Sequence, residues 1–191
     1  MNWKLIFNPF GIYSEKQLFV TGILLTLTGA LLGSFLDVTY DGVLDIHQSE
    51  TDFLTSLKEN GNNVACIFVT LLISGKIINR KTRAIDIFNT ATVSRFPMYI
   101  GAVITSSPIL TRIGDQILNQ RNDIQHLQLK PLDLALLLVI SCVLLMITVY
   151  YITLLVNGFK TSVNAKKWQH FAGFAVALLI AEIISKILIN I

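Results

Sequence analysis

A run of 26 residues without a charged side chain, from Leu134 to Phe159, limits what this chain can fold into more than any other feature. At about 1.5 Å per residue, a helix of that length exceeds the ~30 Å hydrocarbon core of a bilayer. A second uncharged run, nineteen residues from Leu18 to Leu36, is also long enough to cross. Backbone groups in lipid must be bonded within the segment, which favours helices. The two runs predict an all-α, polytopic integral membrane protein.

Composition points the same way. Hydrophobic residues make up 53% of the chain, charged residues only 14%, and the mean hydropathy is +0.63. Soluble domains carry about a quarter charged residues, so the lipid bilayer is the expected solvent. The net charge of +3 is too small and too scattered for nucleic-acid binding, which needs a clustered basic face.

The hydropathy pattern predicts one membrane domain over residues 18–191, a bundle of five transmembrane helices, preceded by an interfacial aromatic segment over residues 1–17. Its expected spans are 18–36, 64–78, 96–111, 134–157 and 171–190. Pro97 and Pro108 interrupt the third of these, so that span should face protein that can satisfy its free backbone groups.

The segment between the first two spans, residues 37–62, is acidic. It predicts a solvated outer loop with a short amphipathic helix of one or two turns that includes Phe53, Leu54 and Leu57. Its acidic residues lack the regular ligand spacing of a calcium loop.

Basic residues predict the orientation. With the N-terminus inside, ten of the fifteen Lys and Arg residues fall in inner segments, which supports N-in and C-out. The inner set is Lys4, Lys16, Lys76, Arg80, Lys81, Arg83, Arg95, Lys160, Lys166 and Lys167, and the outer set is Lys58, Arg112, Arg121, Lys130 and Lys186.

Glu182 and Lys186 form the candidate intramembrane polar site. Glu182 lies about 16 Å along the last span, near the bilayer centre, where an ionisable residue raises a functional hypothesis such as an ion or proton relay. Lys186, four residues later, shares its helix face in the favourable Glu-then-Lys order. The alternative is a self-neutralising structural pair with Lys186 reaching toward the surface.

Two further groups of residues are predicted to make contacts. The candidate lipid-headgroup contacts are Lys76, Arg80, Lys81, Arg83 and Arg95, although any positive-inside loop contains such residues. The predicted helix-packing face is Gly22, Gly29 and Gly33, whose small side chains let helices approach closely.

No pattern indicates a catalytic centre, and we expect no enzyme activity and no cofactor. His47, His126 and His170 are widely separated and show no zinc-type spacing. Cys66 and Cys142 both lie in apolar runs, where buried free thiols are expected.

Three local patterns carry a family likeness. Gly75-Lys76 precedes a basic turn (SGKIINRKTR), and a run toward Pro97 (AIDIFNTATVSRFP) is followed by a second proline at Pro108. The passage between the last two spans reads VYYITLLVNGFKTSVNAKKWQHFAGFAVA. With these features the chain, over about residues 7–191, resembles the Yip domain family of five-span membrane proteins.

The resemblance implies a non-enzymatic membrane organiser or adaptor that acts through lipid, a membrane-protein partner or a second copy of itself. Eukaryotic members of the family interact with Rab-type GTPases in vesicle traffic and carry a long cytosolic N-terminal region. Only about seventeen residues precede the first span here, as in short prokaryotic relatives, which implies the cytoplasmic membrane of a prokaryote. A small transporter or channel built around Glu182 and Lys186 is the alternative hypothesis.

Overall fold

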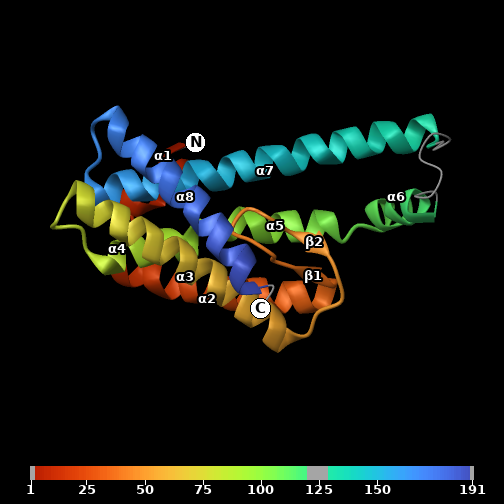
Figure 1. Ribbon diagram of the computed structural model, residues 1–191, viewed down its shortest axis with the longest axis horizontal. Coiled ribbons are helices and arrows are strands. Elements are labelled where there is room, and N and C mark those ends of the chain that lie inside the picture. Colours follow the sequence, from red (N-terminus) through yellow and green to blue (C-terminus); the bar gives the residue numbers. More distant parts are fainter. Residues whose placement is uncertain (1–2, 120–128, 190–191) are drawn as a thin grey trace.

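The computed structural model describes residues 3–119 and 129–189, and Arg121 and His126 lie outside this part of the chain. Helices dominate it (Figure 1). The elements in chain order are α1 (Trp3–Phe7), η1 (Pro9–Gly11), α2 (Glu15–Leu36), β1 (Val38–Thr39), β2 (His47–Gln48), α3 (Phe53–Ile78), α4 (Ala84–Val93), α5 (Phe96–Thr105), α6 (Pro108–Asn119), α7 (Pro131–Val163) and α8 (Trp168–Ile189).

Four of the described helices, α2, α3, α7 and α8, are long and apolar enough to cross a membrane. The prediction of an all-α membrane protein is therefore confirmed at this level. α3 begins at Phe53, because the Asp52 side chain accepts a hydrogen bond of 2.7 Å from the amide of Thr55 and caps the helix. The prediction of a separate, short amphipathic helix at residues 53–57 was wrong, because these residues form the first part of α3.

The region of the expected third span is broken into shorter helices. α4 and α5 run on in the same direction along the bundle, with an interruption at Ser94 and Arg95 (Figure 1). α5 ends at Thr105, and α6 starts at Pro108, whose missing N–H and fixed φ suit the first turn of a new helix. The range 96–111 is thus shared between two helices instead of forming one.

The main hydrophobic core lies where α3, α4, α7 and α8 meet. Its fully buried side chains include Ile67, Leu71, Ile87, Leu155 and Phe159. α8 packs alongside α3, whereas α6 and the first half of α7 project beyond the other helices (Figure 1).

The predicted glycine face of α2 is a contact surface inside the chain. Gly22, Gly29 and Gly33 are all buried. A Cβ added to Gly29 would lie 2.2 Å from the ring of Tyr99 in α5. Added Cβ atoms would lie 2.2 Å from Thr92 Oγ1 at Gly22 and 2.3 Å from Ser56 Oγ at Gly33.

One end of the bundle gathers two interhelical turns. The Asn79 side-chain amide donates to the Val163 carbonyl at 3.1 Å, which joins the α3–α4 turn to the carboxyl end of α7. At the same end, Arg83 pairs with Glu15 at the start of α2. The opposite end holds the segment between α2 and α3 and the end of α8 (Figure 1).

The N-terminal segment lies along α7. The Tyr150 hydroxyl donates to the Ile6 carbonyl at 2.9 Å, and the Asn157 amide donates to the Phe7 carbonyl at 2.8 Å. α1 and η1 are therefore held against a long apolar helix, where Trp3 and Tyr13 remain exposed.

Candidate functional site

The segment between α2 and α3 folds back between the helices. Asp37 ends α2 in the left-handed conformation, with φ of 50°, and turns the chain sharply. β1 then pairs antiparallel with β2, which closes residues 40–46 into a loop. Tyr40 and Val43 of this loop are fully buried. We call residues 40–46 the inserted loop, and its burial differs from the solvated loop that the acidic sequence predicted.

α2 and α3 hold the first residue of the inserted loop by three hydrogen bonds. The Tyr40 amide donates to Glu59 Oε2 at 3.0 Å, and the Asn63 side-chain amide donates to the Tyr40 carbonyl at 2.7 Å. The Tyr40 hydroxyl donates to the Gly29 carbonyl at 2.9 Å. Burial raises the pKa of the Tyr40 phenol.

Arg95 is the largest fully buried side chain of the described residues, at 0% exposure. It lies at the interruption between α4 and α5, and its guanidinium reaches into the centre of the bundle. Nε donates to Asn60 Oδ1 at 3.1 Å, and one Nη donates to the Val43 carbonyl at 3.4 Å. The guanidinium carbon lies 5.7 Å from the centre of the Tyr40 ring, within cation–π range.

Several buried polar atoms around Arg95 have no hydrogen bond among the described residues. They include the second Nη of Arg95, the hydroxyl of Tyr151 in α7 and Oδ1 of Asn63. Buried donors are nearly always satisfied, since leaving one unmade costs about 1–3 kcal/mol. The only groups that Arg95 contacts by hydrogen bond are neutral oxygens, and within the described residues no carboxylate forms an ion pair with it.

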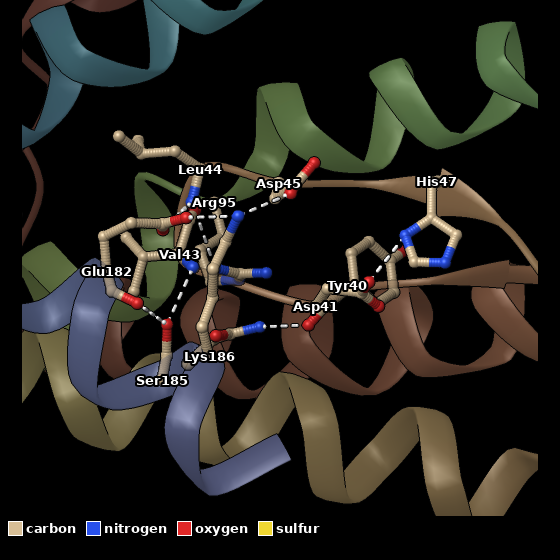
Figure 2. A network of polar contacts seen from close by, with 11 residues as sticks. Tyr40, Asp41, Val43, Leu44, Asp45, His47, Arg95, Glu182, Ser185 and Lys186 are labelled. Atoms are coloured by element: carbon tan, nitrogen blue, oxygen red, sulfur yellow. Dashed lines mark hydrogen bonds and ion pairs between the residues drawn. The ribbon is translucent and has the colours of Figure 1, made fainter. Parts of the chain in front are cut away.

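α8 fastens the other side of the inserted loop. Figure 2 shows Glu182 and Ser185 pointing toward the backbone of Val43 and Leu44. Glu182 Oε2 accepts from the Leu44 amide at 2.8 Å, and Ser185 Oγ accepts from the Val43 amide at 3.2 Å. A Cβ added to Gly42 would lie 2.7 Å from Glu182 Oε1, so a larger residue there would displace the Glu182 carboxylate.

Lys186 adds a charged contact between α8 and the inserted loop. Its Nζ lies 2.8 Å from Asp45 Oδ2 and 3.4 Å from Glu182 Oε1. The predicted neighbours Glu182 and Lys186 therefore do meet, and the inserted loop contributes a second carboxylate to them. The Glu182 side chain is 18% exposed, whereas those of Lys186 and Asp45 are nearly half exposed.

The five predicted headgroup-contact residues separate in the structure. Lys76, Arg80, Lys81 and Arg83 are exposed around the α3–α4 turn. The expectation for Arg95 was wrong, because its fully buried guanidinium is bonded inside the bundle and reaches no headgroup. Its position before Pro97 resembled a span boundary, but α4 places it within the bundle.

Sequence reasoning missed most of the residues around Arg95. Tyr40, Asn60, Asn63, Tyr99 and Tyr151 all take part, through hydrogen bonds or through burial beside the guanidinium. One signal was present: two asparagines three residues apart share a helix face beside the acid Glu59. Polar residues grouped on one face of an apolar helix indicate an internal polar contact.

The cysteines and the acidic or histidine side chains form no further centre in the described ranges. Cys66 is buried, whereas Cys142 is exposed on α7, so the burial predicted for both holds for only one of them. Within residues 3–119 and 129–189, no group of three His, Cys, Asp or Glu residues is placed to hold a metal ion.

Comparison with known proteins finds no family model, no characterised protein and no solved structure that matches this chain.

Proposed function

We propose that this protein is a non-enzymatic membrane organiser of the Yip type, acting through protein and lipid contacts in the cytoplasmic membrane of a prokaryote. The observation that carries the proposal is the use made of Glu182. Its carboxylate accepts the Leu44 amide and pairs with Lys186, so the intramembrane charge fastens a loop to the bundle. A carboxylate with these partners serves structure first.

The arrangement of helices supports five membrane crossings. The hydrogen bond from Asn79 to Val163 brings the α3–α4 and α7–α8 turns to one end of the bundle. The chain between them must leave this end and return, which α4 with α5 and then α7 accomplish (Figure 1). We infer that α4 and α5 together form the third span, with α2, α3, α7 and α8 as the others.

Charge supports an N-in, C-out orientation. The end with the two turns carries Arg80, Lys81, Lys166 and Lys167, whereas the segment from 37 to 52 at the other end is acidic. Basic ends are retained on the cytoplasmic side. The projecting part of α7 offers an apolar surface that a partner helix or a second copy can cover, with Leu138 and Leu145 both more than half exposed.

Thiol labelling at position 182 tests the proposal. Glu182→Cys is made after Cys66 and Cys142 are replaced by serine, and intact vesicles are treated with a charged, membrane-impermeant reagent. We expect protection at 182, with rapid labelling of Glu50→Cys as the positive control because Glu50 is exposed. Affinity capture from native membranes should return a reproducible partner or a second copy of the chain. If it returns neither, the proposed organiser function is contradicted.

A small transporter or channel is the second candidate, and one observation favours it. The buried Arg95 guanidinium has an unpartnered N–H beside the interruption between α4 and α5. Discontinuous helices and intramembrane charges mark substrate paths in transporters. Rapid labelling of a folded Glu182→Cys protein would mean that water enters the bundle, and would favour this function over the organiser.

A further inference from the structure

A surface groove between α3 and α8 is apolar and adjoins a basic hollow formed by α3 and the turn that follows it. The apolar part has a volume of about 430 Å³, within the ~300–1,000 Å³ range of ligand sites. It is lined by Ile73, Ile77, Ile78, Gly173, Val176 and Ile180. A neighbouring hollow of about 770 Å³ shares Ile73 and Ile77 with it and adds Lys76 and Arg80. We call the two together the α3–α8 groove.

The shape of the groove comes from small residues at the helix crossing. Gly173 faces Ser74, and an added Cβ would lie 3.5 Å from the serine oxygen, in ordinary contact. The groove walls are strongly exposed, with Ile73 at 57% and Ile77 at 80%. Branched apolar side chains this exposed on a membrane helix face lipid chains or another helix.

The charge at the basic end of the groove favours a lipid over a second copy of the chain. The Lys76 ammonium donates to the Arg80 carbonyl at 3.2 Å, which keeps the two basic residues together. Neither forms an ion pair with a carboxylate among the described residues, whereas Arg83 nearby is paired with Glu15 and Asp86. A second copy related by a two-fold axis along the membrane normal would bring its own Lys76 and Arg80 to the same end, and the like charges would repel.

We propose that the α3–α8 groove binds one anionic phospholipid from the leaflet on the side of the α3–α4 turn. An acyl chain lies against Ile73, Ile77 and Val176, and the phosphate meets Lys76 and Arg80. Basic residues near the end of a membrane helix, such as Lys76 and Arg80, attract anionic headgroups electrostatically. The inference rests on the proposed function, since it specifies a lipid contact of the organiser.

Retention of phosphatidylglycerol by the purified full chain tests this inference. The protein is exchanged into detergent with equal amounts of phosphatidylglycerol and phosphatidylcholine, and bound lipid is counted by native mass spectrometry. The wild type should retain phosphatidylglycerol preferentially. The double variant Lys76→Gln, Arg80→Gln should lower that preference about 25-fold, because each cation contributes roughly fivefold.

Two matched pairs separate the parts of the site. Arg83→Gln removes a charge that is already paired at the same end, and it should leave retention unchanged. Gly173→Leu fills the apolar part and should reduce retention of both lipids, whereas Gly61→Leu adds the same bulk on α3 where nothing lies within 4 Å. Helix content measured by circular dichroism confirms that each variant is folded.

Equal retention of the two lipids by the wild type would overturn the inference. So would an Arg83→Gln effect as large as that of the double variant, since that would indicate diffuse attraction to the whole basic end. The assay contains no partner protein, so its failure leaves partner capture, and with it the organiser, untouched. Lipid retention without any captured partner would count against the organiser alone.

Discussion

At the scale of single residues, Arg95 determines how the centre of the bundle is built. Its guanidinium joins α3 to the inserted loop through Asn60 and the Val43 carbonyl, from a position between two helices. A planar, permanently charged group with several donors can make both bonds at once. The same donors explain why a buried charge is tolerated here: oxygens surround it on two sides and an aromatic ring lies nearby.

Arg95→Lys should destabilise the protein by about 1–3 kcal/mol. A single ammonium cannot reproduce the two directed hydrogen bonds of the guanidinium, so one buried oxygen loses its donor. Unfolding in mixed micelles measures this loss. Arg83→Lys is the matched control, since its exposed pair with Glu15 contributes little and the lysine keeps the charge. Equal effects of the two substitutions would show that the buried bonds of Arg95 do not stabilise the fold.

At the scale of elements, the sequence predicted the helices well and their interactions poorly. Long uncharged runs identified α2 and α7, and hydropathy identified α8 despite Glu182 and Lys186, because crossing a bilayer requires length and apolarity that the sequence displays directly. The inserted loop could not be predicted in this way. Its burial depends on partners distant in sequence, such as Ser185 for Val43 and Glu59 for Tyr40, and periodicity carries no information about them.

The surroundings of two helical glycines, Gly29 in α2 and Gly61 in α3, predict opposite effects of alanine on stability. Gly29→Ala should destabilise by about 1–3 kcal/mol, because the new methyl group would overlap the Tyr99 ring and force α2 and α5 apart. Gly61→Ala should stabilise by up to about 1 kcal/mol, since helix propensity rises and nothing lies within 4 Å. Unfolding in mixed micelles measures both. If Gly29→Ala left the free energy of unfolding unchanged, α2 and α5 would not be in close contact.

The amino end of α3 should respond to acid. Hydrogen bonding by the side chain and amide of Thr55 lowers the pKa of Asp52 in the folded protein. Stabilisation by this cap is therefore present above the unfolded pKa of about 3.9 and is lost as the pH falls through the lower folded pKa. Thermal unfolding at pH 6 and pH 3 measures it. Asp52→Asn still caps the helix but does not titrate, so its midpoint should fall less; an equal fall would contradict the assignment.

At the scale of the whole molecule, the number of crossings determines which surfaces share a side of the membrane. Four apolar helices alone would place the α3–α4 turn and α6 on the same side, because no crossing would lie between them. A third span made of α4 and α5 would place them on opposite sides. The hydrogen bond between Asn79 and Val163 favours the second arrangement, since it requires the chain to leave that end and come back.

Single cysteines at three exposed positions test this arrangement in sealed, oriented vesicles. We expect Asp115→Cys in α6 to be labelled from the same side as Glu50→Cys and from the side opposite to Lys81→Cys. α3 crosses between positions 50 and 81 in either arrangement, so these two calibrate the sides. Labelling of 115 together with 81 would mean that α4 and α5 do not cross. In that case the buried Arg95 would belong to a re-entrant segment that enters and leaves by the same face, and the protein would have four crossings with both termini on one side.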